Sequence, residues 1–492
     1  MNTPLRRVAL AVMAMIVALL ANATYVQVFK ADSLRADPRN QRVLVDEYSR
    51  QRGLISADGQ VLAFSETIAD RFKYLRAYPN DNTQALANAP VTGYYSMQYS
   101  STGLERAEDP ILNGSDNRLF GARLFDLVSG RDPRGGNVLT TINPVLQQVA
   151  YDELSARNLT GSVVALDPKS GAILAMVSTP SYDPNPLASH DGTVRTEAWN
   201  ALVDDPANPM LNRAISATYP PGSTFKVVTS ATALSHGGTV DEQLTAAAGL
   251  TLPDTNTVLN NFGDAPCGSG PTVSLMTAFK LSCNAAFAEL GIKYGADDLK
   301  AQAAAFGIGP DSPAIPLAVA DSTVGTIPDP AALGQSSIGQ RDVAMTPLQN
   351  AVVAATVANG GVRMEPYLVK QLQGPDLSTL STTQPKSLGQ SVSPEIAATL
   401  TEMMVESEKN TSGFGSIPGL EIASKTGTAE HGSTPKETPP HAWYIGFAPA
   451  NNPTIAIAVL VEDGGDRGLA ATGGSVASPI GRAVMAAATQ GG

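Results

Sequence analysis

The first apolar run of the chain covers residues 8–29, which are 22 residues without a charged side chain. As a helix it would be about 33 Å long at ~1.5 Å per residue, which matches the hydrocarbon core of a bilayer. Arg6 and Arg7 precede the run, and Ala21-Asn22-Ala23 is only a weak match to a signal-peptidase site. We therefore expect residues 1–30 to be a short cytoplasmic tail and an uncleaved transmembrane anchor, with the rest of the chain outside the cytoplasm.

Residues 31–158 contain short apolar runs, such as 60–64, but no long run with helical spacing. We expect an irregular α+β domain here, standing as a pedestal beside the membrane. Near its end, Asn143 and Pro144 have the character of an N-cap followed by a first-turn proline, and apolar residues then recur on one helical face. This helix should lead into a second domain at about residue 159.

The remaining residues, 159–492, alternate between strand-like and helix-like patterns. Stretches rich in β-branched and other apolar residues predict five antiparallel strands, at 162–166, 172–178, 421–429, 442–447 and 454–462. Alanine-rich stretches with helical spacing lie at 225–235, 275–294, 346–359 and 478–490. The Ser/Thr/Gln-rich stretch 377–390 is interpreted as a surface loop. The pattern predicts an α/β (α+β) domain in which helices flank a five-stranded sheet.

The charge balance argues against nucleic acid as a partner. Thirty-three Lys and Arg residues face 45 Asp and Glu residues, which gives a net charge of -12, and such a surface repels a phosphate backbone. The four histidines form no cluster with metal-ligand spacing, so we expect no metal and no cofactor, and we place His431 and His441 on the surface around a proline-rich loop. Cys267 and Cys283 are candidates for one disulfide in an oxidising compartment, with two buried free thiols as the alternative.

Ser223-Thr224-Phe225-Lys226 combines a nucleophile with a base. A lysine three positions after a serine lies on the same face of a helix and can accept the hydroxyl proton. The preceding Pro220-Pro221-Gly222 would place the serine at a helix start, where the partial positive charge favours an oxyanion. The same S-x-x-K pattern also occurs at Ser433-Thr434-Pro435-Lys436, so the motif alone decides little.

Two further motifs select the first candidate by their order. S-x-N occurs at Ser115-Asp116-Asn117 and at Ser282-Cys283-Asn284, whereas K-T-G occurs once, at Lys425-Thr426-Gly427. Only Ser223, Ser282 and Lys425 follow the order S-x-x-K, S-x-N, K-T-G that characterises penicillin-binding proteins and serine β-lactamases.

Each motif residue has a chemical interpretation. Lys226 would act as base if burial and Lys425 lower its pKa. Ser282 could relay a proton to the leaving amine, and Asn284 could hold the substrate amide. Lys425, Thr426, Gly427 and Thr428 would form a strand edge that receives an extended peptide and its carboxylate, while the Ser223 and Thr428 amides would form an oxyanion hole.

Longer segments extend this likeness over most of the chain, and on them the sequence resembles the class B, monofunctional penicillin-binding proteins. They are RQRGLISADGQVLA from Arg50, GSVVALDPKSGAILAMVSTPSYDPN from Gly161, NRAISATYPPGSTFK from Asn212, SIGQRDVAMTPLQNA from Ser337 and HAWYIGFAPA from His441. The resemblance implies a dimerisation-like pedestal and a transpeptidase domain whose Ser223 is acylated by D-Ala-D-Ala stem peptides of peptidoglycan. It also implies cross-linking to an amine acceptor during growth or division, covalent inhibition by β-lactams, and glycan polymerisation by another protein, such as a multispanning glycosyltransferase.

Other functions share these motifs. A serine β-lactamase needs a deacylating base, and the E-x-x-x-N match at Glu406 to Asn410 falls late, in an apparent helix. A D,D-carboxypeptidase differs only in its acceptor, and a divisome scaffold without turnover would not need the motifs intact. The position of Cys283 inside S-x-N adds the hypothesis that a disulfide to Cys267 braces the loop beside the nucleophile.

Overall fold

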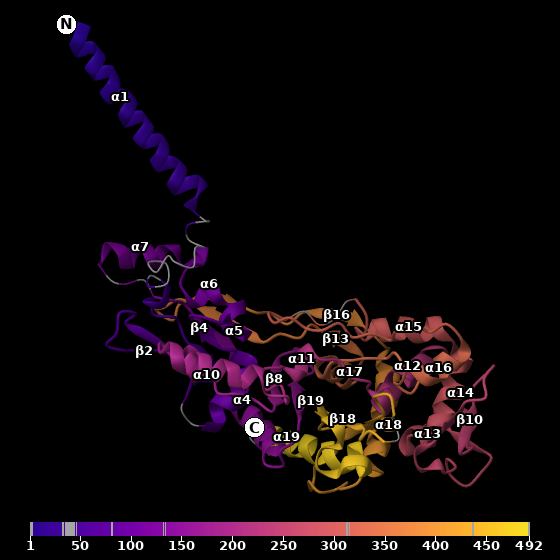
Figure 1. The fold of residues 1–492 in the computed structure, drawn as a ribbon. Helices are drawn as coiled ribbons and strands as arrows, with labels where there is room; N and C mark the ends of the chain where they lie inside the picture. The colour runs from indigo at the N-terminus through magenta and orange to yellow at the C-terminus, as the bar shows by residue number, and fades with distance from the viewer. Residues whose placement is uncertain are drawn as a thin grey trace.

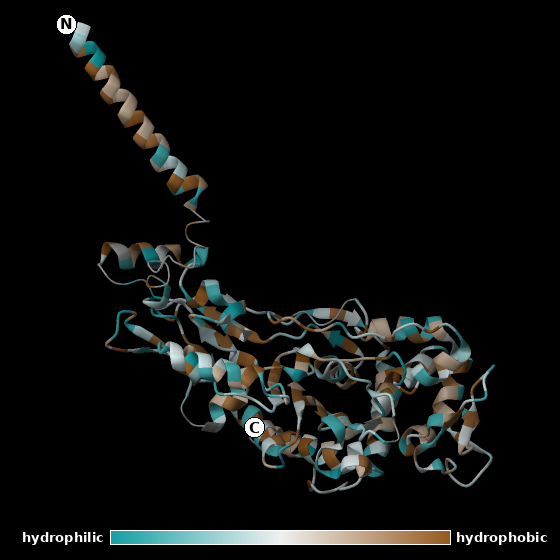
Figure 2. Ribbon diagram, in the orientation of Figure 1, coloured by the Kyte–Doolittle hydropathy of each residue, from teal (hydrophilic) through white to brown (hydrophobic). Residues whose placement is uncertain are grey.

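The N-terminal helix projects from the body of the molecule (Figure 1). The computed structural model describes residues 3–490, except 32–33, 35–44, 46, 80–81, 131, 133, 311–312, 314 and 435–436. α1 (Thr3–Thr24) continues through a π-helical turn, Tyr25–Phe29, and within the described residues this is the one helix long and apolar enough to cross a membrane. Figure 2 shows that most of its residues are hydrophobic, and none of the apolar stretch is buried by the protein. Its length and composition suit a membrane anchor.

The pedestal is built on a six-stranded sheet. In sheet order its strands are β15 (Thr379–Thr382), β14 (Val369–Gln373), β6 (Asn137–Thr140), β1 (Ile55–Ala57), β2 (Gln60–Thr67) and β3 (Tyr74–Ala77). β1 and β6 are parallel, and the other neighbours are antiparallel. The pedestal also contains α4 (Asn82–Thr92), α5 (Gly103–Ala107), α6 (Asp109–Leu112), α7 (Phe120–Val128) and the short hairpin β4 (Tyr95–Ser96) and β5 (Ser100–Ser101).

Two strands of this sheet come from far downstream, so the prediction that 377–390 is a surface loop is wrong. The stretch contains β15 and β16 (Ser387–Gln390), and β16 pairs with β13 (Val362–Met364). Serine and threonine suit a solvent-facing strand, and the partners that order these strands are not visible in local composition. The division of the chain at residue 158 remains a prediction, because strands from both sides of it share one sheet.

The second sheet has five antiparallel strands, as predicted. In sheet order they are β17 (Ala423–Ala429), β18 (His441–Ala448), β19 (Ile455–Val461), β7 (Gly161–Leu166) and β8 (Ile173–Thr179). β18, β19 and β7 are buried on both faces. α8 (Pro144–Ser155) and α19 (Ser478–Gln490) pack on one face, and the Asn143 side chain caps α8 as its sequence indicated.

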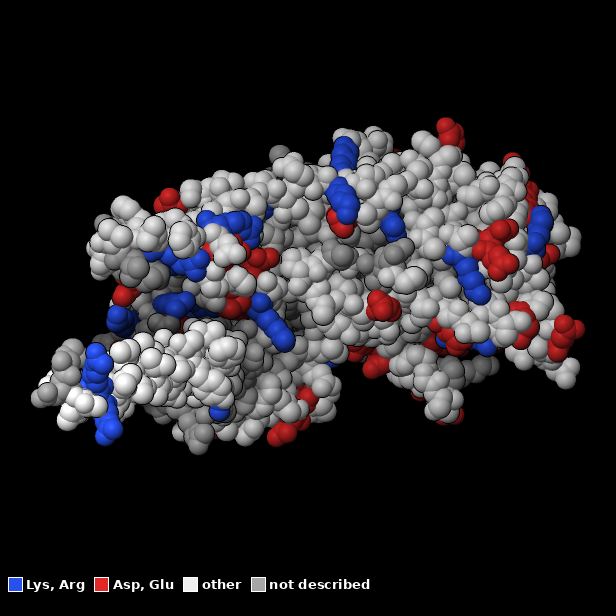
Figure 3. Space-filling model, turned by 90° about the horizontal axis from the view of Figure 1, so that it is seen from above, with Lys and Arg blue, Asp and Glu red and all other residues white. Residues whose placement is uncertain are grey.

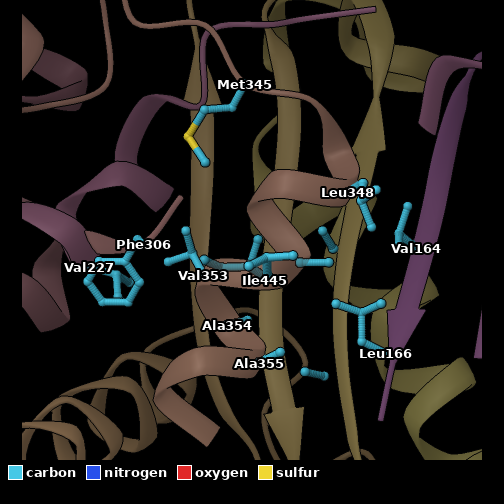
Figure 4. Close-up of a cluster of buried hydrophobic side chains, with 14 of the residues drawn as sticks. Val164, Leu166, Val227, Phe306, Met345, Leu348, Val353, Ala354, Ala355 and Ile445 are labelled. Atoms are coloured by element: carbon cyan, nitrogen blue, oxygen red, sulfur yellow. The ribbon is translucent and has the colours of Figure 1, made fainter. Parts of the chain in front are cut away.

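The other face of this sheet is covered by α17 (Pro347–Ala358), which is almost entirely buried. Figure 4 shows Leu348 beside Val164 of the sheet, while Val353 lies toward Phe306 and Val227. The surrounding helices are α12 (Lys226–Ser235), α14 (Asn284–Tyr294), α15 (Ala296–Ala305), α16 (Pro330–Ser336) and α18 (Pro394–Lys409). Short elements complete the domain: α9 (Asn185–Ala188), α10 (Gly192–Val203), α11 (Arg213–Ser216), β9 (Gln243–Thr245) with β12 (Thr272–Ser274), and β10 (Gly249–Thr251) with β11 (Val258–Asn260).

The helical stretch predicted at 275–294 is two helices, and the break between them forms part of the site. α13 (Leu275–Leu281) ends at Ser282, whose φ of 60° lies in the left-handed region, and α14 begins at Asn284. A disulfide joins Cys283, between the two helices, to Cys267. The continuous helical spacing of apolar residues concealed this break, because Ser282 is not one of the residue types that usually ends a helix.

Candidate active site

Ser223 lies in a tight turn that leads into α12. The 3-10 turn Gly222–Phe225 keeps Ser223 partly exposed, while the next two residues, Thr224 and Phe225, are buried. The turn is held by its neighbours, because Trp443 Nε1 donates to the Pro220 carbonyl at 3.0 Å and the Thr224 hydroxyl donates to the Pro221 carbonyl at 2.9 Å. Within the described part of the chain, no side chain binds the Ser223 hydroxyl, so its oxygen is available for reaction.

Asn350 is a supporting residue that the sequence interpretation missed. Its Nδ2 donates to Thr224 Oγ1 at 3.0 Å from the buried helix α17, and so links the turn to the core of the domain. A polar side chain in the middle of an apolar helical stretch was the available signal, since buried polar groups require partners.

Lys226 is fully buried, and its amine points at the S-x-N loop. Nζ donates to the Ser282 carbonyl at 2.7 Å, to Asn284 Oδ1 at 2.8 Å and to Ser282 Oγ at 3.3 Å. Burial lowers the pKa of Lys226 well below the 10.5 of an exposed lysine, and the positive charge of Lys425 lowers it further. A neutral amine at neutral pH is a base that can accept a proton from a nearby hydroxyl.

Lys425 reaches the same hydroxyl from the sheet. Its Nζ donates to Ser282 Oγ at 2.9 Å and to the Thr426 carbonyl at 3.0 Å. Burial lowers the pKa of Lys425 to about 7. A neutral Lys226 has two hydrogens, which the Ser282 carbonyl and Asn284 Oδ1 accept, so its lone pair is left to take a proton from a nearby hydroxyl. The structure thus brings the three predicted motifs together around one serine hydroxyl.

Asn284 is in turn positioned by the loop before it. Its Nδ2 donates to the Asn260 carbonyl at 3.0 Å, which leaves Oδ1 facing Lys226. Cys283, the residue between Ser282 and Asn284, is tied to Cys267 by the disulfide. The left-handed Ser282, the disulfide and the Asn260 contact together fix the direction of both polar side chains.

Gly427 allows β17 to lie against the nucleophile turn. A Cβ atom at this position would be 2.8 Å from the Pro221 carbonyl oxygen and 3.1 Å from Thr224 Cγ2. Gly222, with φ of 54°, makes the matching approach, since a Cβ there would lie 3.0 Å from the Thr428 carbonyl oxygen. Two glycines therefore bring Ser223 and the K-T-G strand closer than other residues would allow.

Thr426 and Thr428 alternate with the buried Lys425 and Gly427 along β17, and both are half-exposed. β17 is an edge strand, paired only with β18, so its other side is free to bind an extended peptide. Among the described residues, no side-chain hydrogen bond engages either threonine hydroxyl. Both hydroxyls are thus available to a ligand at this edge.

The competing motif matches lie elsewhere. Asp116 of the upstream S-D-N caps a 3-10 turn in the pedestal and pairs with Arg118. Pro435 and Lys436 of the second S-x-x-K lie outside the described residues. Glu406 of the E-x-x-x-N match is paired with Lys280 at 3.1 Å and Lys409 at 2.7 Å, and the hydrogen bond from Lys409 is the main cause of its lowered pKa. A carboxylate held in two ion pairs is a weak base for deacylation.

The expectation that His431 and His441 are both surface residues is wrong for His441, which is buried at the start of β18. The two rings stack with centroids 3.8 Å apart, and burial and then His431 lower the pKa of His441 to about 3. With Asp463 they place three possible metal ligands within 4.8 Å of one another. These atoms already bond within the protein, because His431 Nε2 lies 3.0 Å from Asp463 Oδ1 and His441 Nδ1 accepts from the Asp463 amide at 3.2 Å. These contacts join His431, in the loop between β17 and β18, to Asp463, which follows β19.

Comparison with known proteins agrees with this geometry. The family model described as the penicillin-binding protein transpeptidase domain matches residues 161–486, and that described as the penicillin-binding protein A dimerisation domain matches residues 52–138. Peptidoglycan D,D-transpeptidase PbpA of Mycolicibacterium smegmatis is 64% identical over 99% of each chain. The protein of the same name from Mycobacterium tuberculosis is 61% identical over the full length of both. The solved structure of penicillin-binding protein A from M. tuberculosis as a penicillin G acyl-enzyme has a TM-score of 0.85 and 60% identity, and the match covers 90% of this chain and 100% of that one.

Proposed function

Because this chain belongs to the penicillin-binding protein transpeptidase family, we propose that it is a peptidoglycan D,D-transpeptidase of the cell wall. The observation that carries the proposal is the buried amine of Lys226, which lies three residues after Ser223 and is hydrogen-bonded to Ser282 and Asn284. A serine β-lactamase or a D,D-carboxypeptidase would use the same first step, so the proposal has two parts, acylation and then transfer.

In the acylation step, Ser223 Oγ forms a bond to the carbonyl carbon of the penultimate D-Ala of a stem peptide. Lys226 takes the hydroxyl proton, and the backbone amides of Ser223 and Thr428 stabilise the oxyanion. The C–N bond to the terminal D-Ala then breaks, and the Ser282 hydroxyl gives its proton to the departing amine while it takes up the proton held by Lys226, so that Lys226 is neutral again. The position of Ser282 supports this role, since its Oγ lies 3.3 Å from Lys226 Nζ and 2.9 Å from Lys425 Nζ.

In the transfer step, an amine of a second stem peptide attacks the ester carbonyl. The new C–N bond forms and the C–Oγ bond breaks, while the proton lost by the attacking amine passes through Lys226 to Ser223 Oγ. A β-lactam enters the first step in the same way, but its cleaved nitrogen stays attached to the acyl group, so no leaving group departs. The half-exposed hydroxyls of Thr426 and Thr428 and the cation of Lys425 suit the carboxylate that stem peptides and β-lactams share.

We also infer the setting of this activity. Arg6 and Arg7 before the apolar helix favour a cytoplasmic N-terminus, which would leave the catalytic domain outside the membrane. Growth or division would then require glycan strands made by a partner, for which a multispanning glycosyltransferase is our candidate. The division into an anchor (1–30), a pedestal (31–158) and a transpeptidase domain (159–492) belongs to the same proposal.

The response to an acceptor amine distinguishes a transpeptidase from a carboxypeptidase or a β-lactamase. The full-length protein in detergent is incubated with a donor peptide ending in D-Ala-D-Ala, with and without an acceptor amine, and the products are separated by mass. A transpeptidase gives the amide-linked product at the expense of the hydrolysed one as the acceptor concentration rises. Hydrolysis alone at every acceptor concentration would establish a carboxypeptidase, and rapid turnover of penicillin would establish a β-lactamase. Absence of all three activities would favour the alternative that the protein is a divisome scaffold without turnover.

A further inference from the structure

α7 exposes an apolar surface to the surroundings. Phe120, Leu124, Phe125 and Val128 are 63%, 50%, 64% and 81% exposed. Scattered exposed apolar residues are normal in proteins, but four large ones on a nine-residue helix form a contiguous patch. The patch is defined here as the apolar stripe of α7.

Helical geometry places the stripe on a single face. At about 100° per residue, Phe120, Leu124, Val128 and Phe125 fall within an arc of about 140°. Asp126 lies on the opposite side of the helix and is buried, with 4% of its surface exposed. A surface helix of a soluble domain normally has the reverse arrangement, with its apolar side inward and its carboxylates in water. The stripe is therefore suited to an apolar environment outside this domain.

The stripe lies where the chain arrives from the anchor. Gly53 donates from its amide to the Leu112 carbonyl at 2.9 Å, and the Gly135 amide donates to the Gln51 carbonyl at 2.9 Å. α7 thus belongs to the segment between Leu112 and Gly135, and both ends of this segment contact residues 51–53, near the start of β1. Figure 1 shows α7 at the end of the body from which α1 departs.

Arginines border the stripe. The Arg123 guanidinium carbon lies 5.9 Å from the ring centroid of Phe120, and Arg118 is on the turn immediately before the helix with about half of its side chain exposed. Figure 3 looks onto the molecule from the anchor side and shows basic groups around the pedestal end, interspersed with acidic ones. An apolar stripe bordered by guanidinium groups matches the boundary between lipid chains and phosphate headgroups.

We propose that α7 is an interfacial helix that places its apolar stripe in the outer surface of the membrane. This proposal rests on membrane anchoring of α1. Because the anchor already holds the body at the bilayer, even weak partitioning of a short helix is sufficient for binding, since the local concentration of membrane is high. Together the anchor and α7 attach the body at two places, which would fix the tilt of the pedestal and the direction in which the catalytic domain extends.

The test uses an environment-sensitive fluorophore on the full-length protein. Cys267 and Cys283 are bonded to each other, so Leu124→Cys supplies a unique thiol for an NBD label. The protein is reconstituted in vesicles of phosphatidylcholine and phosphatidylglycerol, with or without lipids that carry a doxyl quencher. Val258→Cys, at an exposed position of β11, is the matched control.

The label at position 124 is expected to shift its emission to the blue and to lose intensity with doxyl lipid, whereas the label at 258 does neither. Adding Phe120→Ser and Phe125→Ser should abolish both changes at 124. Unquenched, water-like emission at 124 would overturn the proposal. A blue shift without quenching that grows with protein density would also overturn it and assign the stripe to contacts between proteins. Acylation by penicillin is measured on the same samples, so failure of the membrane contact is distinguishable from failure of the proposed activity.

Discussion

Gly427→Ala tests whether close approach of β17 to the nucleophile turn is needed for acylation. The added methyl group would lie 2.8 Å from the Pro221 carbonyl oxygen, 3.1 Å from Thr224 Cγ2 and 3.1 Å from Trp443 Cβ. Two of these neighbours belong to the turn that carries Ser223. Since one of the contacts is with the backbone and Thr224 is held by hydrogen bonds, the strand and the turn must separate by several tenths of an ångström.

The substitution should affect both the free energy of unfolding and the rate of acylation. Overpacking of this kind lowers the free energy of unfolding by about 1–3 kcal/mol. A shift of about 1 Å in a reacting group can cost roughly 100-fold in rate, so the smaller displacement here should slow acylation by about 10-fold or more. We expect a lower melting temperature and a lower second-order rate constant for acylation by a fluorescent penicillin, measured over time on full-length protein.

Gly192→Ala is the matched control for this substitution. Its added methyl group would meet only Arg195 Nη2 at 3.6 Å, at the start of α10. Alanine in a helix costs less than glycine, so stability and acylation should be unchanged or slightly improved. If Gly427→Ala acylated at the wild-type rate, the argument that glycine brings the strand to the turn would be refuted, whatever its effect on stability.

Three further results are expected. Lys226→Met should slow acylation by about 100- to 10,000-fold, because the base is lost. The melting temperature should not fall, because methionine suits a buried site. Acylation at the wild-type rate would rule out the lysine as base. Replacing Cys267 and Cys283 by serine should lower the free energy of unfolding by about 3 kcal/mol for a loop with a sequence separation of 16, as measured with denaturant, and an unchanged midpoint would contradict a bonded pair. In the folded protein the pKa of Lys425 is about 7, below its unfolded value, so the unfolded chain binds more protons between about pH 7 and 10. The free energy of unfolding should therefore rise with pH across that window, and Lys425→Met should flatten the rise. An equal slope in both proteins would show that the lysine is not desolvated.

Local sequence patterns were sufficient to predict the strands of the five-stranded sheet and the central residues of the active site. The strands of the five-stranded sheet were readable because each is a short run of β-branched and apolar residues between turn sequences. Ser223 and Lys226 were readable because a spacing of three on a helix brings side chains to one face. The order of the motifs then excluded Ser115 as a member of the site, although its match to S-D-N is literal.

Features that depend on distant partners were not readable in the same way. The pairing of β14 with β6 joins segments separated by more than two hundred residues, and β15 enters the same sheet only through β14. His441 is buried where its ring contacts that of Tyr219, more than two hundred residues away, and stacks on that of His431. Neither contact leaves a local trace in composition, so the sequence suggested a loop in one case and a surface residue in the other.

The measurement that tests the central claim most directly is the intact mass of the full-length protein after exposure to benzylpenicillin, in wild type and in Ser223→Ala. The account predicts that the wild type gains the mass of one whole penicillin molecule, retains it through purification and carries it on the peptide that contains Ser223, while the variant gains nothing. An adduct of the same mass on Ser223→Ala, or penicillin hydrolysis by the wild type without a lasting adduct, would contradict the account.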